Sequence, residues 1–119
     1  YELYKDLFHG FAYGTLMPFR AGTDSNKWFY SLCIDRSRIT ASMREIIVAL
    51  HGKGIETRAI WGLINEQKPY EHEETYQLEK APYYADRILN IPSSTQITED
   101  EIRYVADEVK QLLSALAEG

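Results

Sequence analysis

The sequence has little cysteine, no long hydrophobic run and no excess of basic residues, and each absence excludes a class of protein. Its one cysteine, Cys33, leaves no partner for an internal disulfide, which fits a reducing cytoplasm. The longest apolar run covers residues 46–50, far below the roughly 20 residues that span a bilayer. The 18 acidic residues outnumber the 13 basic ones, which gives a net charge of −5. We therefore expect a cytoplasmic protein with no nucleic-acid partner and no membrane partner.

The sequence also lacks the common motifs of metal, phosphate and hydrolytic sites. Three histidines and the cysteine (His9, Cys33, His51 and His72) are scattered without the paired spacing of zinc ligands. No glycine-rich phosphate loop and no Gly-x-Ser-x-Gly sequence is present. The acidic run of residues 71–74 is typical of a solvated first turn of a helix. We predict no metal site and no catalytic residue in this chain.

What the chain contains is the composition of one small globular domain. Its 119 residues, 45% hydrophobic and 26% charged, are enough for a single hydrophobic core. Residues 1–8 have apolar side chains at helical spacing but no capping residue ahead of them, so we interpret them as the tail of a longer helix from a larger polypeptide. We expect the aromatic residues of this opening, Tyr4 and Phe8 among them, to face a domain outside this chain.

Two helices carry their own start signals. Residues 42–45 and 98–101 each place a hydroxyl residue three positions before a glutamate, which is the spacing of a capping box. Apolar residues then recur at intervals of three and four over residues 43–50 and 102–116, which predicts two amphipathic helices. Gly54 is suited to the positive φ that ends the first of them.

Strand signals lie between the helices. Residues 28–34 alternate, with Trp28 on the apolar face, and predict a strand. Shorter strands are expected over residues 87–91 and 16–19, and a further one over residues 55–61.

A third helix is expected over residues 75–86, with a break or kink near Ala81 because Pro82 lies inside it. Helices and strands therefore alternate along the chain. This order predicts an α/β (α+β) fold, a small sheet with helices packed on one face, in a single domain that spans residues 1–119.

Residues 54–70 begin as a strand and continue as a polar loop of about a dozen residues. Alternation places Trp61 on one face of the strand and Arg58 on the other, less apolar face. An arginine just before a long loop is well placed to bind a carboxylate or phosphate through two hydrogen bonds. A structural ion pair with Glu56 or Glu66 is the alternative, and the residues alone favour it.

The same stretch resembles a known family. Residues 53–58, Lys-Gly-Ile-Glu-Thr-Arg, are followed by Trp61 and by Asn-x-Gln-x-Pro-Tyr over residues 65–70. This pattern is similar to the C-terminal small domain of the sugar aminotransferases of the DegT/StrS family. Two positions depart from it, because Ala59 stands where many members have proline and Asn65 where many have histidine.

Later segments carry the same resemblance. Residues 88–94 and 97–102 look like the Leu-x-Leu-Pro strand end and the closing helix of that family, and residues 26–30 look like the first strand of its small domain. The resemblance covers about residues 26–113.

The resemblance implies the small domain of the aspartate-aminotransferase fold, with a mainly antiparallel sheet. Family members bind pyridoxal phosphate through a lysine of a large domain, so we expect this fragment alone to hold no cofactor and to be inactive. The implied parent is a homodimer that transfers an amino group, with glutamate as donor, to a nucleotide-linked keto-sugar in surface-polysaccharide or lipopolysaccharide biosynthesis. Arg58 and Asn65 are implied to bind substrate.

A second interpretation comes from another class of protein. The chain is then a free-standing small α/β binding or regulatory domain without catalytic activity, which only shares this layout. A longer reading frame upstream of Tyr1, encoding a large domain with the cofactor lysine, would separate the two interpretations.

Overall fold

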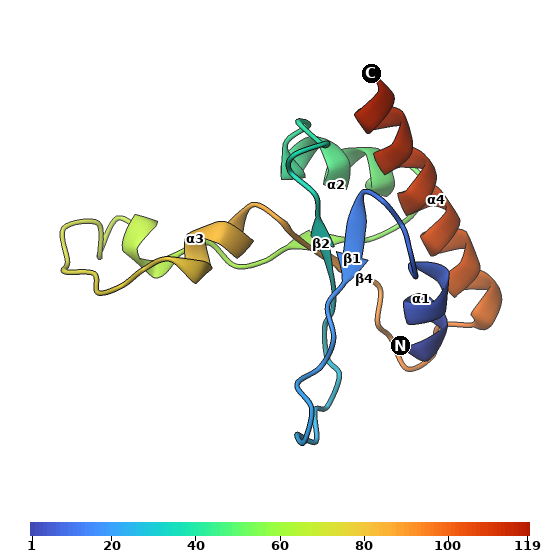
Figure 1. Ribbon diagram of the computed structural model, residues 1–119, viewed down its shortest axis with the longest axis horizontal. Helices are drawn as coiled ribbons and strands as arrows, with labels where there is room; N and C mark the ends of the chain where they lie inside the picture. The colour runs from blue at the N-terminus through green and yellow to red at the C-terminus, as the bar shows by residue number, and fades with distance from the viewer.

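The computed structural model of the protein describes all residues, 1–119, and Figure 1 shows its helices and strands. The order of the major elements agrees with the predicted one. In chain order they are α1 (Glu2–Leu7), β1 (Gly14–Leu16), β2 (Tyr30–Ile34), α2 (Met43–His51), β3 (Arg58–Ala59), the 3-10 helix η1 (Ile64–Glu66), α3 (Lys80–Ala85), β4 (Ile88–Ile91) and α4 (Glu99–Glu118).

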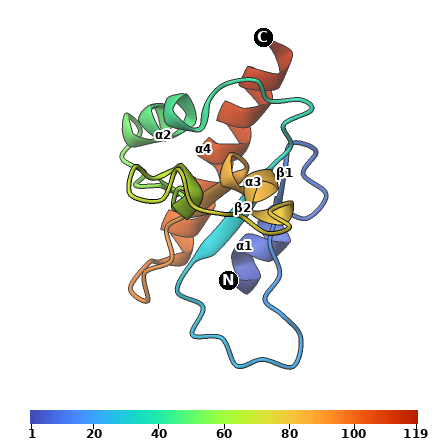
Figure 2. The same cartoon turned by 90° about the vertical axis from the view of Figure 1, so that its left-hand side faces the viewer.

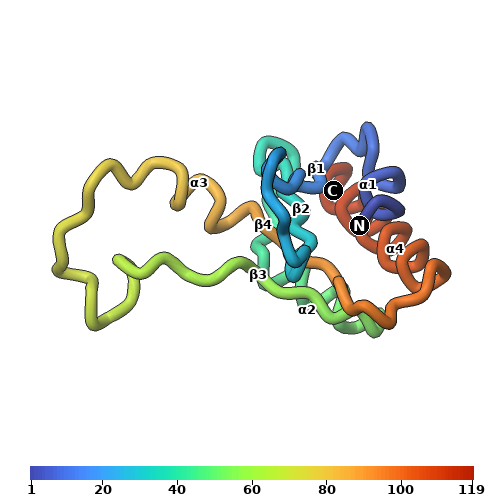
Figure 3. Tube along the Cα trace, turned by 90° about the horizontal axis from the view of Figure 1, so that it is seen from below, coloured from blue at the N-terminus to red at the C-terminus, as the bar shows by residue number.

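Four antiparallel strands form one sheet in the order β1-β2-β4-β3. Helices α1, α2 and α4 lie on one side of this sheet, and α3 lies away from it on the other side (Figures 1 and 3). The predicted fold, a small antiparallel sheet with helices packed on one face, is confirmed. We call the face without these helices the open face; alternation assigns to it Ser31, Cys33, Arg58 and Asn90.

The hydrophobic core lies between the sheet and the helices. Every second residue of β2 and β4 faces the helices, and α4 contributes the predicted apolar stripe. Removal of this apolar surface from water, at about 25 cal/mol per Å², is the main stabilising term of the fold. The buried side chains of these three elements are Leu32, Ile34, Leu89, Ile91, Val105, Val109 and Leu113.

Helix α1 belongs to this core, which corrects one expectation. Tyr4 and Phe8 are 0% and 3% exposed, so they do not face a domain outside the chain. Because they are four residues apart, both rings lie on the side of α1 that packs against α4. None of the helices, α4 included, has the length and apolar character of a membrane span.

Both predicted capping boxes are formed. Ser42 accepts a hydrogen bond from the backbone N–H of Glu45, and the Glu45 carboxylate accepts one from the backbone N–H of Ser42. Thr98 and Glu101 form the same reciprocal pair at the start of α4. Gly54 follows α2 with a φ of +75°, as predicted.

The strand predicted over residues 55–61 is wrong in its extent, because only Arg58–Ala59 is a strand. Trp61 is 73% exposed and has left the sheet. The reason is the length of the neighbouring strand. β4 begins at Ile88, whose carbonyl accepts the hydrogen bond from the N–H of Ile60, so no strand backbone remains to pair with later residues.

The strand predicted over residues 28–34 begins only at Tyr30. Opposite Tyr30 the partner strand β4 ends and is followed by Pro92, which has no N–H to continue the ladder. Trp28 is therefore 63% exposed rather than part of the apolar face. The strand expected over residues 16–19 lies slightly earlier, as β1.

Helix α3 is also shorter than the predicted 75–86, because it covers only Lys80–Ala85. Gln77, three residues before α3 begins, has a φ of +46°, which is incompatible with a right-handed helix at that position. Pro82 is the third residue of α3. It lies in the first turn, where a backbone N–H has no helical partner, and the predicted break inside the helix is wrong for this reason.

Two segments project from the body of the molecule (Figures 1 and 2). We call residues 17–29 the hairpin and residues 60–86 the arm. The arm contains η1 and α3 but no buried residue. Its exposed apolar side chains are typical of a segment that packs on another protein surface. The largest are Trp61, Ile64, Tyr70, Tyr76, Leu78 and Tyr83.

Candidate functional site

A row of three polar residues crosses the open face of the sheet. Ser31 of β2 pairs with Asn90 of β4, and Asn90 pairs on its other side with Arg58 of β3. The Ser31 hydroxyl donates a hydrogen bond of 2.7 Å to the amide oxygen of Asn90. We call these residues the polar row. It brings a cation, an amide and a hydroxyl together on a face that none of α1, α2 and α4 covers.

The Arg58 guanidinium is available for binding. Its Nη2 lies 3.7 Å from Oε1 of Glu56, and their side chains are 77% and 83% exposed. An ion pair this open contributes about 0–1 kcal/mol. Of the two predicted alternatives, the pair with Glu56 therefore exists but is weak, and the pair with Glu66 does not form. Several of the five N–H donors of Arg58 remain free for a ligand.

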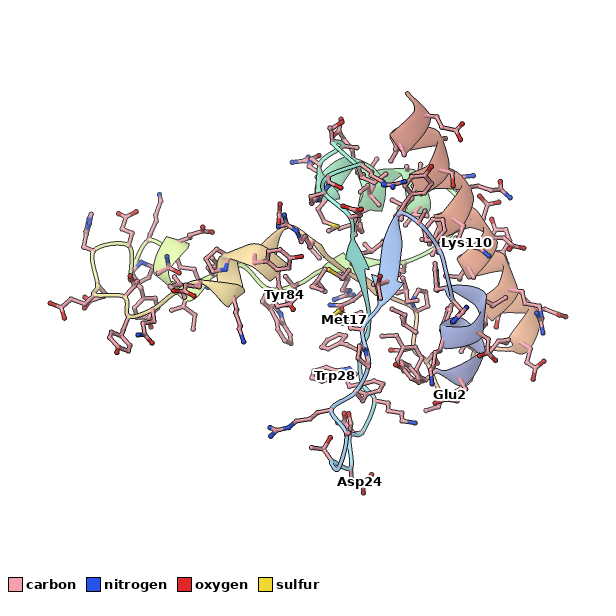
Figure 4. All side chains as sticks on the ribbon, in the orientation of Figure 1. Glu2, Met17, Asp24, Trp28, Tyr84 and Lys110 are labelled. Atoms are coloured by element: carbon pink, nitrogen blue, oxygen red, sulfur yellow. The ribbon has the colours of Figure 1, made fainter.

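Three aromatic side chains that are close in sequence to Ser31 and Arg58 contact one another. Phe29 precedes Ser31 by two residues and lies just before β2 begins at Tyr30. Its ring centroid lies 4.5 Å from that of Trp28 and 5.5 Å from that of Trp61. In Figure 4, Met17 and Trp28 lie where the hairpin leaves the sheet, and Tyr84 lies on the arm. The hairpin and the arm thus contact each other through Trp28, Phe29 and Trp61, which we call the aromatic corner.

The structure does not bring Asn65 to the polar row. Asn65 lies in η1, in the arm, where it is half-buried. It lines a groove of about 510 Å³ together with Trp61, Tyr70 and other apolar side chains of the arm. Arg58, in contrast, is held in the sheet. The two residues predicted to bind substrate therefore belong to separate parts of the chain, Arg58 to the sheet and Asn65 to the arm. Trp61 lies between them in the sequence and lines the same groove as Asn65.

Cys33 also lies on the open face but is not an activated nucleophile. Burial raises the pKa of its thiol, and the nearby guanidinium of Arg87 only partly offsets this effect. The thiol is therefore protonated near neutral pH.

Sequence reasoning missed the residue that anchors the arm. The Nε and Nη2 atoms of Arg36 donate to the backbone carbonyl of Asp86, at 2.9 and 2.6 Å. Its Nη1 donates to the carbonyl of Ala41. The Arg36 side chain is only 12% exposed, so these contacts are partly shielded from water. Nothing in the sequence distinguishes it from Arg38, which is exposed two positions later.

Comparison with known proteins defines first the fold and then the family. DesI, solved in the presence of its TDP-sugar product, matches with a TM-score of 0.87 and 22% identity over 98% of this chain and 30% of its own. PseC of Helicobacter pylori matches with a TM-score of 0.85 and 17% identity over 96% of this chain and 31% of its own. TlmJ of Streptoalloteichus hindustanus matches with a TM-score of 0.80 and 22% identity over 97% of this chain and 30% of its own. All three are aminotransferases.

The chain belongs to the DegT/DnrJ/EryC1/StrS aminotransferase family, whose sequence pattern matches residues 1–110. It spans about 30% of the length of the solved structures that it matches. No curated protein matches its sequence. The predicted family and fold are therefore confirmed.

The chain's own side chains do not fit the cofactor that such a family implies. Pyridoxal phosphate is held through a lysine amine, and no lysine belongs to the polar row or the aromatic corner. Lys53 pairs with Glu108, and Lys110 donates to the carbonyl of Leu7, both on the helix side of the sheet.

Proposed function

We propose that this chain is the substrate-binding small domain of a pyridoxal-phosphate-dependent sugar aminotransferase. The parent transfers an amino group from glutamate to a nucleotide-linked keto-sugar in surface-polysaccharide or lipopolysaccharide biosynthesis. Family membership over residues 1–110 supports the reaction class. The substrate class is supported by DesI, whose structure contains a TDP-sugar product, and by PseC, which acts in the biosynthesis of pseudoaminic acid.

One observation carries the assignment of this chain to substrate binding. The open face presents the largely exposed, weakly paired guanidinium of Arg58, and Trp61 of the aromatic corner follows it by three residues in the chain. A guanidinium binds the two oxygens of a carboxylate or phosphate, and flat aromatic rings pack on the apolar faces of sugars and bases. Asn65, on the arm, is proposed as a second substrate contact. A lysine elsewhere in the parent would hold the cofactor, and the chain alone would be inactive.

The parent is proposed to be a cytoplasmic homodimer. The arm supports an assembled protein, because it exposes large apolar side chains without any core of its own. The single free cysteine, Cys33, fits a reducing compartment.

The experiment is to substitute Arg58→Ala in the full-length enzyme. Loss of a charge-assisted hydrogen bond, worth roughly 1.5–3 kcal/mol, should raise the KM of the amino donor or of the sugar nucleotide about 10- to 100-fold. The Tm should stay nearly unchanged, because the side chain is exposed and weakly paired.

The matched control is Arg103→Ala. Arg103 is an exposed arginine of α4, on the opposite side of the sheet, and its loss should leave both KM values unchanged. Unchanged KM values for both substrates in Arg58→Ala, or a loss of stability without a change in KM, would refute the substrate-binding role.

A further inference from the structure

Asn90 is held in one orientation on the open face. Its amide oxygen accepts the hydrogen bond from the Ser31 hydroxyl, at 2.7 Å. The oxygen is therefore directed across the strands toward β2. The amide NH2 group has no acceptor in the protein, and the side chain is only half-buried. Asn90 thus presents two unused N–H donors from a fixed position in a central strand.

Asn90 and Arg58 are neighbours across the β3–β4 pair. The two residues are Cα partners across the β3–β4 pair, so their Cβ atoms are about 5 Å apart and their side chains leave the same face of the sheet. Ser31 occupies the other side of Asn90 and takes up its oxygen. The NH2 group of the Asn90 amide is left unused, and we expect it to reach a ligand oxygen that Arg58 binds.

We propose that Asn90, oriented by Ser31, is a further substrate-binding residue and shares with Arg58 one oxyanion of the substrate. The inference rests on the proposed substrate-binding role of Arg58. The oxyanion is either the carboxylate of the amino donor or the diphosphate of the nucleotide sugar, because both offer paired oxygens to an arginine and an amide. Asn90 is a binding residue here, and Ser31 is a positioning residue.

The decisive variant in the full-length holoenzyme is Asn90→Asp. Aspartate has the shape of asparagine and can still accept the hydrogen bond from Ser31, but a negative oxygen replaces the NH2 donor. Binding of the oxyanion should weaken at least about tenfold. Binding of the carboxylate is measured as the KM for L-glutamate in the first half-reaction. Binding of the diphosphate is measured as the Kd for TDP and for UDP.

Two further variants separate binding from structure. Ser31→Ala removes only the group that orients Asn90, and should weaken the same ligand by a smaller factor. Gln111→Glu is the matched control, because it makes the same amide-to-acid change at an exposed position of α4 and should alter neither constant. The double variant Arg58→Ala/Asn90→Ala should lose less affinity than the product of the two single losses, since both residues bind one group.

The outcomes are separable. A loss confined to L-glutamate assigns the carboxylate, and a loss confined to TDP and UDP assigns the diphosphate; either supports the inference. If Arg58→Ala weakens a ligand but Asn90→Asp and Asn90→Ala do not, the inference is overturned while the proposed function stands. If neither residue affects any ligand, both fail. A lower Tm in the Asn90 variants with unchanged binding would also overturn the inference, because it would show a purely structural pair.

Discussion

The arginine that anchors the arm makes the sharpest test of how this chain is held together. Arg36 ties the end of the arm to the loop between β2 and α2, by donating to the backbone carbonyls of Asp86 and Ala41. Arg36→Met keeps most of the apolar stem of the side chain and removes every donor. The two closest carbonyl acceptors, those of Asp86 and Ala41, then lose their charged partner at once, and so does the carbonyl of Ile39 at 3.4 Å.

The expected loss of stability follows from those two acceptors. A hydrogen bond from a charged donor contributes about 1.5–3 kcal/mol, and the lower value applies here because the Asp86 carbonyl is partly open to water. The sum is about 3 kcal/mol, which is a large part of the 5–15 kcal/mol of a typical domain. At a urea m-value of roughly 1.5 kcal/mol/M, the midpoint of unfolding should fall by about 2 M.

The assay is urea unfolding of the wild-type chain, Arg36→Met and Arg38→Met, followed by circular dichroism. Arg38 is a close control, because it is two positions away, 57% exposed, and paired with Asp35 only at 3.8 Å. Its loss should change the free energy of unfolding by less than about 0.5 kcal/mol. Hydrogen exchange should also become faster in α3 of Arg36→Met alone. Equal midpoints for the two variants, or unchanged exchange in α3, would refute the anchoring role.

Two further predictions concern a buried group and two exposed groups of the helices. The Tyr4 hydroxyl is buried without a hydrogen-bond partner, and burial raises its pKa well above the ordinary value. Tyr4→Phe should therefore leave the free energy of unfolding unchanged or raise it by up to about 1 kcal/mol, and a loss of more than 1 kcal/mol in urea unfolding would reveal a partner for the hydroxyl. Hydrogen bonds from Ser42 to Glu45 and from Thr98 to Glu101 lower the pKa of both glutamates below 4.5, so the stability that they contribute is complete above pH 4.5 and is lost as the pH falls through the lowered values. The Tm should drop on acidification below pH 4.5, and the drop should be smaller in Glu45→Gln/Glu101→Gln; the same drop in both proteins would contradict this linkage.

The local structure of this chain follows from its residue pattern alone. The capping boxes at Ser42 and Thr98 and the left-handed Gly54 all form as predicted. Each depends on residues at most a few positions apart, so the pattern already contains both partners. The apolar stripe of α4 is similar, because helical geometry alone brings its members to one face.

The alternation of residues along β3 also predicted the position of one candidate site residue. Arg58 lies on the less apolar face that strand alternation assigns to it, although its role in binding stays a prediction. The resemblance to the aminotransferase family indicated the fold class, and the structure confirms it.

The ends of the strands and the residues that meet on the open face depend instead on how the whole chain packs. The predicted strand at residues 55–61 ends early because its neighbour β4 supplies no further backbone partner. Ser31 and Asn90 are 59 positions apart in the chain, and Arg36 and Asp86 are 50 apart. Contacts over such distances depend on the order and register of the strands. That order is set by burial of the whole core, which no local pattern of residues contains.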